Sequence, residues 1–122
     1  MPSKINSYRD LVAWQKAIAL TDSIYSATET FPPREVYALS SQLRRASVSI
    51  PSNIAEGSVR GSKEFLHFIN IARGSLAEIE TQLIIAKQRD FITINTYDDS
   101  LQRTDELSRI LMGLLKSLKS TN

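Results

Sequence analysis

Apolar side chains recur every three or four residues in four long stretches of the chain, which is the spacing of helices that bury one face. The first stretch follows Ser7 and Asp10, whose spacing is that of a capping box. We therefore predict a first helix from about Tyr8 to Glu29, with one row of side chains in the core. The members of this row are Leu11, Trp14, Ile18, Thr21, Tyr25 and Thr28.

The second stretch begins after Phe31-Pro32. Pro33 fits the first turn of a helix, where its missing N–H is not needed, and Glu35 suits the positive end of the helix dipole. We predict that the second helix begins there and continues to about Gly57. Its apolar row consists of Leu39, Leu43, Ala46, Ile50, Ile54 and Gly57.

This second row runs straight through Pro51. A proline inside a helix removes one backbone hydrogen bond and crowds the carbonyl four residues earlier, here that of Ser47. We predict a continuous helix that bends at Pro51, with water or the hydroxyl of Ser47 or Ser49 bonded to the freed backbone groups. A break into two helices at Ser49-Ile50 is the alternative.

A turn over residues 57–61, with Ser62 as the next N-cap, leads to a third helix from about Lys63 to Gln88. Its apolar row consists of Phe65, Phe68, Ile69, Ala72, Leu76, Ile79, Leu83 and Ala86. The aromatic members of the rows are expected in the core: Trp14, Tyr25, Phe65 and Phe68.

A short connector over residues 91–95 precedes the fourth helix, for which Thr96 and Asp99 repeat the capping-box spacing. Its row consists of Leu107, Leu111, Leu114 and Leu118. Ile110 and Leu115 flank this row, and we expect self-association to cover them. Four amphipathic helices with short connections predict an all-α fold, an antiparallel up-and-down four-helix bundle that forms a single domain over residues 1–122.

Composition narrows the class of protein further. The net charge is only +2, so binding to nucleic acid depends on where the cations lie rather than on their number. The chain has no cysteine, and no apolar run is long enough to span a membrane. We expect a soluble cytoplasmic protein, whose candidate phosphate contacts in the middle of the chain are Arg44, Arg60, Lys63 and Arg73.

The second helix has an organised polar face opposite its apolar row. Small residues alternate there with single charged residues, which favours close approach by another helix. We predict a structural polar network at a helix or subunit contact, in which Arg45 pairs with Glu56 through Asn53 in a partly buried site. A ligand pocket is the alternative. The network consists of Arg45, Ser49, Asn53 and Glu56.

Three segments of the chain together carry a family resemblance. They are Asp10–Ala17, Gln42–Gly57 with the string QLRRASVSIPSNIAEG, and Ile71–Glu78. In these segments, and in Phe31-Pro32 followed by Glu35, the chain resembles the bacterial four-helix-bundle proteins encoded in 23S ribosomal RNA intervening sequences. The resemblance implies an up-and-down bundle that assembles as a homopentamer.

A related branch of that family is the accessory variability protein of diversity-generating retroelements. By resemblance, this relation implies a reverse transcriptase partner and binding of nucleic acid through a basic surface. The leading hypothesis is therefore a non-catalytic oligomeric adaptor that binds RNA or DNA. The alternative is a protein-interaction scaffold with no nucleic-acid contact.

Catalysis and metal binding have little support in the sequence. Glu64 and His67 have the spacing of half a di-iron site, but the chain has no second histidine to complete one. Glu78 and Glu80 point to different sides of a helix and cannot work together as an acid and a base. We expect no enzymatic activity, no cofactor and no metal.

Overall fold

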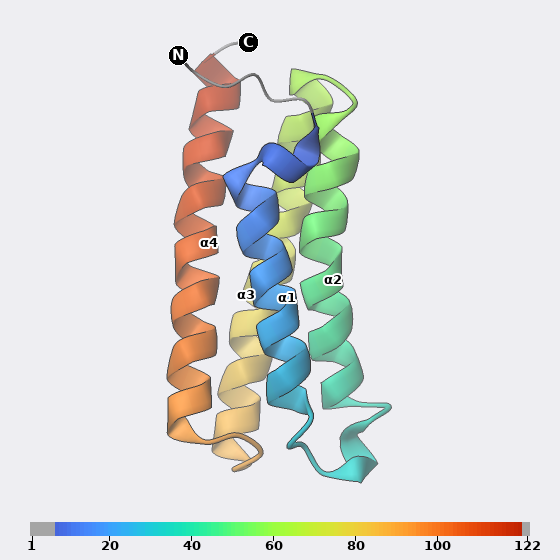
Figure 1. Ribbon diagram of the computed structural model, residues 1–122, viewed down its shortest axis with the longest axis vertical. Helices are drawn as coiled ribbons and strands as arrows, with labels where there is room; N and C mark the ends of the chain where they lie inside the picture. Colours follow the sequence, from blue (N-terminus) through green and yellow to red (C-terminus); the bar gives the residue numbers. More distant parts are fainter. Residues whose placement is uncertain (1–6, 121–122) are drawn as a thin grey trace.

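The computed structural model describes residues 7–120, which form four long α-helices and two short 3-10 helices (Figure 1). Within this part of the chain there is no strand. The prediction of an all-α four-helix bundle is confirmed. The elements in order are η1 (Tyr8–Asp10), α1 (Val12–Thr28), η2 (Pro33–Glu35), α2 (Leu39–Ser58), α3 (Ser62–Gln88) and α4 (Ile94–Ser120).

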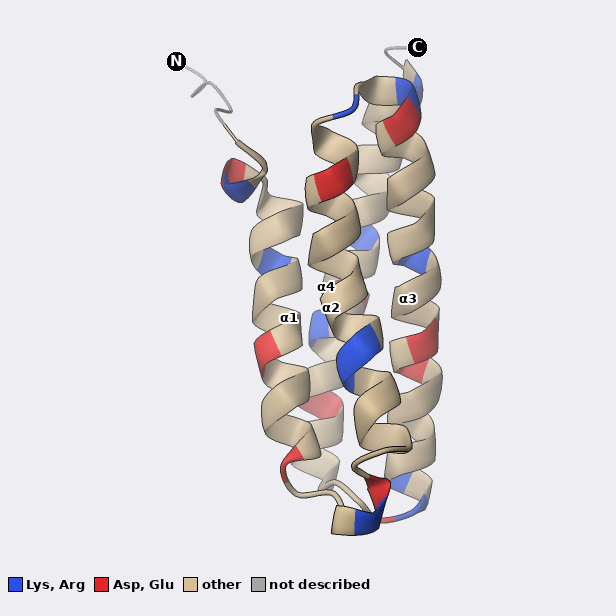
Figure 2. Cartoon of the chain, turned by 90° about the vertical axis from the view of Figure 1, so that its right-hand side faces the viewer, with Lys and Arg blue, Asp and Glu red and all other residues tan. Residues whose placement is uncertain are grey.

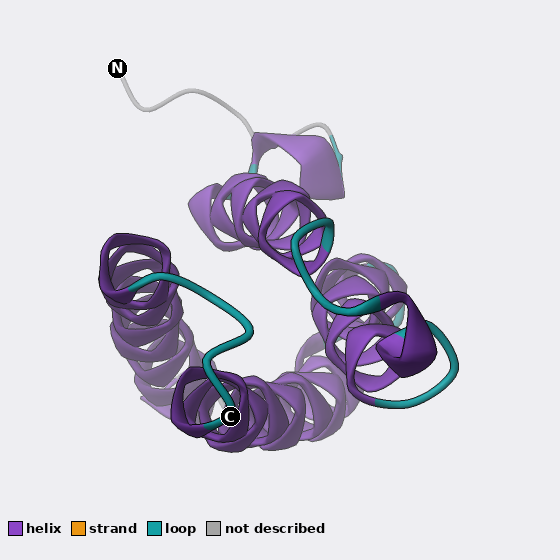
Figure 3. Ribbon diagram, turned by 90° about the horizontal axis from the view of Figure 1, so that it is seen from below, coloured by secondary structure: helices purple, strands orange, loops and turns teal. Residues whose placement is uncertain are grey.

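Successive helices run antiparallel and lie side by side, so that α1 contacts α2 and α4, and α3 contacts α2 and α4 (Figures 1 and 3). The diagonal pairs, α1 with α3 and α2 with α4, make no comparable contact. Packing is most extensive between α2 and α3 and least extensive between α1 and α4. The C-terminus of α4 and the α2–α3 turn lie at one end of the bundle, called here the upper end.

One hydrophobic cluster fills the space between the helices. The predicted row of α2 is buried throughout, and that of α3 is buried except for Phe68, which is half-buried. At the middle of the bundle, Leu43, Ile50 and Ile54 of α2 are completely excluded from solvent, as is Leu111 of α4. The period of 3.6 residues in the sequence therefore identified the core faces of α2 and α3.

The predicted core row of α1 is wrong for most of its members, although Thr28 is buried as predicted. Ile18 is 42% exposed and Tyr25 is 40% exposed, while Trp14 is only half-buried. Trp14 and Ile18 instead line a hollow between α1 and α2, together with Val48 and Pro51. The core face is instead made by Ala13, Ala17, Leu20, Ile24 and Ala27.

The ends of α1 and α2 also differ from prediction. Ser7 and Asp10 do form a capping box, but it caps the start of the short helix η1. Helix α1 begins only after the extended residue Leu11. Pro33 opens η2 rather than α2, because Ala38 has a non-helical backbone conformation. The Glu35 carboxylate accepts a hydrogen bond from the Leu39 backbone N–H at 3.3 Å, in the first turn of α2.

Helix α2 continues through Pro51 without a break, so the alternative of two helices is wrong. The bend at this proline stays a prediction. Pro51 deprives the Ser47 carbonyl of its usual partner. This carbonyl lies 2.9 Å from the Thr21 hydroxyl of α1, whose single hydrogen it shares with the Ala17 carbonyl, also at 2.9 Å. The Ser47 hydroxyl instead bonds to the Arg44 carbonyl at 2.8 Å. The compensating donor therefore comes from a neighbouring helix.

The start of α3 and the start of α4 are each shifted from the predicted cap. Gly61, with a φ of 97°, is the N-cap of α3, and Ser62 is already helical. Only glycine adopts this conformation without strain. At α4, Thr93 rather than Thr96 caps the helix, since its hydroxyl oxygen lies 3.2 Å from the Thr96 backbone N–H.

The apolar row of α4 is rotated slightly from the prediction. Leu107 and Leu111 are buried as expected, whereas Leu114 and Leu118 are only half-buried. Leu115 is 3% exposed and belongs to the core. The expectation that self-association must cover Leu115 is therefore wrong, because the bundle itself covers it.

Candidate nucleic-acid interface and the polar face of α2

The polar face of α2 contains a small hydrogen-bonded group that reaches α3. The Asn53 side-chain amide donates to the Ser49 carbonyl at 2.7 Å and lies 3.0 Å from the Ser49 hydroxyl. The Ser75 hydroxyl of α3 lies 3.0 Å from the same Ser49 hydroxyl. Ser49 and Asn53 are half-buried and Ser75 is buried. Of the predicted network residues, Ser49 therefore connects α2 to α3, and Asn53 is bonded to Ser49 within α2.

The other two residues of the predicted network do not join it. Glu56 pairs with Arg60 one turn further along, at 2.7 Å, instead of with Arg45. Within residues 7–120, no carboxylate forms an ion pair with Arg45. Both Arg45 and Glu56 are exposed in the isolated chain. The predicted Arg45–Glu56 pairing is wrong because the arginine at i+4 competes for the glutamate.

Beside the hydrogen-bonded group lies a hollow of about 330 Å³ between α2 and α3, called here the α2–α3 hollow. Its lining includes the small residues Ala46, Ser49 and Ser75 and two oppositely charged residues, Arg45 and Glu78. Gln42 and Gln82 complete the lining.

Gln82 is 9% exposed, and its amide nitrogen lies 3.4 Å from the Gln42 side-chain oxygen. The Gln82 carbonyl oxygen is buried and has no hydrogen-bond partner among the described residues. A buried acceptor without a donor costs about 1–3 kcal/mol. The α2–α3 hollow therefore contains a polar group that the isolated chain does not satisfy.

Gly57, near the upper end of α2, allows α2 and α3 to pack closely. A Cβ atom at this position would lie 2.7 Å from the Phe68 Cβ and 3.0 Å from a ring carbon of Phe65. The sequence analysis placed Gly57 in the core row and at the helix end. Its close contact with α3 could not be seen in the sequence.

The predicted phosphate-binding cations do not form one cluster. Arg44 is half-buried against α1, where its Nε donates to the Thr28 hydroxyl at 2.8 Å and its guanidinium lies 4.8 Å from the centre of the Tyr25 ring. Arg44 is also far from Arg60. Helix α2 ends at Ser58, two residues before Arg60, and Ser58 is about 21 Å from Arg44 along the helix axis. Figure 2 shows basic and acidic positions interspersed along the visible helices.

Arg60, Lys63 and Arg73 differ in how far they are already engaged. Arg60 lies between two carboxylates, at 2.7 Å from Glu56 and 3.7 Å from Glu64, and also over the Phe68 ring. The Arg73 guanidinium donates to the Asn70 side-chain oxygen at 3.0 Å and remains exposed. Lys63 is exposed and forms no ion pair within the described part of the chain.

Two further cations, which the sequence analysis did not select, lie at the upper end of the bundle. Because α3 and α4 are adjacent and antiparallel, the last turns of α4, with Lys116 and Lys119, lie beside the first turn of α3, with Lys63 (Figure 1). Neither lysine of α4 has a carboxylate partner among residues 7–120. In the sequence, the antiparallel order of the predicted helices already indicated that the end of the fourth helix lies beside the start of the third.

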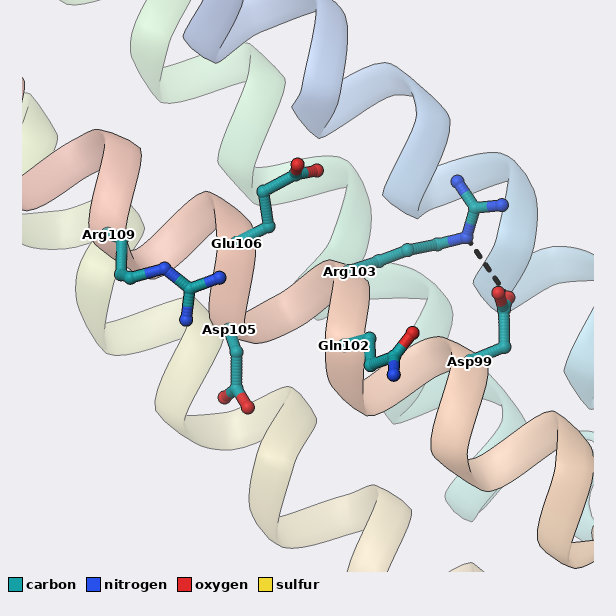
Figure 4. A pocket seen from close by; sticks show the side chains of 6 residues that line it. All are labelled: Asp99, Gln102, Arg103, Asp105, Glu106 and Arg109. Atoms are coloured by element: carbon teal, nitrogen blue, oxygen red, sulfur yellow. Dashed lines mark hydrogen bonds and ion pairs between the residues drawn. The ribbon is translucent and has the colours of Figure 1, made fainter.

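A second hollow, of about 510 Å³, lies along the outer side of α4 (Figure 4). Arg103 and Asp99 form an ion pair there at 3.0 Å, while Glu106 pairs with Lys16 of α1 at 3.3 Å. Asp105 and Arg109, one turn apart, form no ion pair with any described residue. Figure 4 shows their side chains extending from the same side of α4.

The described residues contain no group of three or more His, Cys, Asp or Glu side chains placed to hold a metal ion. His67 is exposed, and the nearby Glu64 is engaged with Arg60. None of the four helices in the described part combines the length and apolar character needed to cross a bilayer.

The fold is that of a small all-α protein, a four-helix bundle in which α2 and α3 are in close contact. The sequence profile of the 23S rRNA-intervening sequence protein family matches residues 9–113, and the chain belongs to that family. This confirms the family resemblance, whereas the relation to diversity-generating retroelements stays a prediction. No curated protein gives a significant match.

Among solved structures, the chain is similar to a crystal structure from Bacteroides thetaiotaomicron, described as a protein with unknown function from the S23 ribosomal protein family. The TM-score is 0.78 at 22% sequence identity, and the match covers 86% of this chain and 96% of that one. This similarity supports the fold.

Proposed function

We propose that the protein is a non-catalytic, homo-oligomeric adaptor that binds the phosphate backbone of RNA or DNA through a cationic surface at the upper end of the bundle. The observation that carries the proposal is the grouping of Lys63 with Lys116 and Lys119, none of which is paired with a carboxylate of the described chain. Unpaired surface cations neutralise phosphates without first losing an intramolecular partner. Arg73, exposed about 15 Å further along α3, extends the surface.

Assembly matters to this proposal because each chain carries a net charge of only +2. Repetition of a modest cationic surface in one oligomer lets a flexible polyanion contact several copies at once, which raises the overall affinity. Contacts to phosphate carry no sequence information, so binding should be indifferent to base sequence. By resemblance, a pentamer is the expected assembly.

Fluorescence anisotropy with labelled single-stranded RNA and duplex DNA tests this function. We expect binding at about 20 mM salt that weakens steeply towards about 150 mM, because each neutralised phosphate releases counterions. The triple variant Lys63→Glu, Lys116→Glu, Lys119→Glu should lose binding while circular dichroism shows an intact helical bundle.

A matched control reverses three cations at the opposite end of the bundle: Arg34→Glu, Lys87→Glu and Arg89→Glu. This variant has the same net charge as the first and should retain most of the binding. Equal loss in both variants would contradict a localised surface, and no binding by the native protein at low salt would contradict the function.

A protein-interaction scaffold without nucleic-acid contact is the second candidate. It is favoured by apolar side chains exposed near the lower end, namely Val36 at 51%, Tyr37 at 94% and Ile94 at 53%. Tyr37→Ser and Ile94→Ser should then abolish association with a protein partner and leave anisotropy with RNA unchanged.

A further inference from the structure

We infer that His67 is a proton-dependent phosphate contact of the cationic surface at the upper end of the bundle, so that nucleic acid binds more tightly in mildly acidic solution. The inference rests on the proposed function and names a residue and a condition that regulate it. Three observations carry it: the place of His67 on α3, the engagement of the nearest carboxylates with Arg60, and a sequence that has no other histidine.

His67 lies one helical turn from Lys63. Both side chains are exposed, and residues four apart on a helix are neighbours on its surface. Along the axis of α3, His67 is about 7.5 Å from Ser62, where the helix begins. On the adjacent antiparallel α4, Lys116 is about 6 Å from Ser120, where the described part of that helix ends. His67 therefore lies in the same upper turns as the lysines of the cationic surface (Figure 1).

An aromatic neighbour restricts the His67 ring. The rings of His67 and Phe68 lie edge to face, with their centres 5.4 Å apart. The Arg60 guanidinium lies 5.3 Å from the centre of the same Phe68 ring. A side chain that is restricted before binding loses less conformational entropy when it contacts a phosphate.

The carboxylates around His67 are engaged elsewhere. Glu64, one turn earlier on α3, lies 3.7 Å from the Arg60 guanidinium, and Glu56 of α2 binds the same guanidinium at 2.7 Å. The charged residues that α4 places at this end are the two lysines of the cationic surface. His67 forms no ion pair within residues 7–120. A proton on His67 therefore adds to the cationic surface a charge that no carboxylate of the described chain is paired with.

Proton binding by His67 and phosphate binding are linked. A phosphate beside the ring favours the charged form of the histidine, so that proton uptake accompanies binding. By reciprocity, the protonated ring holds phosphate more tightly than the neutral one. Histidine is the side chain that ordinarily changes its charge between about pH 5 and pH 8. Binding is therefore strongest at acid pH and weakens as the pH rises and His67 loses its proton.

Fluorescence anisotropy with labelled oligouridine, whose base does not take up a proton in this range, tests the inference at about pH 5.5 and about pH 7.5. At about 50 mM salt, the native protein should bind about five- to tenfold more tightly at the lower pH. The slope of log K against log salt should be steeper there by about 0.7 for each chain in contact with the strand, the effect of one more neutralised phosphate. His67→Gln should bind at both pH values as the native protein does at the higher pH, and His67→Lys as the native protein does at the lower pH.

The matched control moves the histidine to the opposite end of α3. His67→Gln combined with Gln88→His keeps the number of histidines and places the ring at the exposed last residue of the helix, about 31 Å away along the axis. This double variant should bind oligouridine without pH dependence. Circular dichroism at both pH values should show the same helix content for the native protein and every variant.

Three results would overturn the inference. They are native binding that is the same at both pH values, a pH dependence that persists in His67→Gln, and an equal pH dependence in the double variant, which would assign the effect to total charge rather than to position. Each of them, found with a native protein that binds oligouridine, leaves the proposed function standing. Absence of native binding at both pH values would instead remove the proposed function, and this inference with it.

Discussion

The two diagonal helices, α2 and α4, are held in the bundle by different means. Helix α2 bonds across to α1 through Thr21 and Ser47, bonds to α3 through Ser49 and Ser75, and meets α3 closely at Gly57. Helix α4 packs mainly through a row of leucines. Its charged side-chain contacts to neighbouring helices in the described chain are exposed ones: the ion pair between Lys16 and Glu106, and the Lys87 ammonium of α3, which lies 4.6 Å from the centre of the Tyr97 ring.

This difference shows which parts of the chain specify one arrangement of the helices. Leucines at helical spacing pack acceptably in several registers, because hydrophobic burial is non-directional. A hydroxyl that must reach one carbonyl, or a glycine that must meet one aromatic side chain, fixes the register of α2 against its neighbours. We therefore infer that α2 carries most of the structural specificity of the bundle.

Among the stability effects that distinguish α2 from α4, we expect the largest from substitution at Gly57. Gly57→Val places a branched side chain where even a Cβ would lie 2.7 Å from Phe68, and should lower the free energy of unfolding by about 3 kcal/mol. Gly113→Val, in open space on α4, is the matched control and should change it by less than about 0.5 kcal/mol. Urea denaturation of both variants measures the difference, and equal costs would contradict the proposed role of Gly57.

The sequence predicted the features that depend on period alone. The buried faces of α2 and α3 follow directly from apolar spacing, as does the number of helices. The core of α1 was missed because three of its six buried residues are alanines, whose small apolar surface gives a weaker pattern than the exposed Ile18 and Tyr25.

The candidate site was predicted less well than the fold, because its contacts depend on residues distant in the sequence. Thr21 lies 26 positions from Ser47, and Lys116 and Lys119 are more than 50 positions from Lys63. The choice of Glu56 as the partner of Arg45 overlooked Arg60, although a spacing of four was visible in the sequence.

Loss of the hydrogen bond between Thr21 and the Ser47 carbonyl, which compensates for Pro51, should give an intermediate effect on stability. Thr21→Val leaves the Ser47 carbonyl without its donor and should lower the free energy of unfolding by about 1–2 kcal/mol. In a Pro51→Ala background the alanine N–H can bond to the same carbonyl, so Thr21→Val should cost less there. A double-mutant cycle by thermal denaturation measures this coupling. Thr81→Val, which removes an exposed hydroxyl bonded only within α3, is the control.

The ion pair between α1 and α4 should give the smallest effect. Lys16 and Glu106 are 3.3 Å apart, but their side chains are 46% and 48% exposed, so water screens the attraction and holding two flexible side chains in place opposes it. Glu106→Gln should therefore lower the free energy of unfolding by at most about 0.5 kcal/mol, and the difference should vanish in about 1 M salt. Urea denaturation at low and high salt checks this value. A loss as large as that of Thr21→Val would mean that α4 is also positioned by a specific polar contact, and that the distinction between the two diagonal helices is wrong.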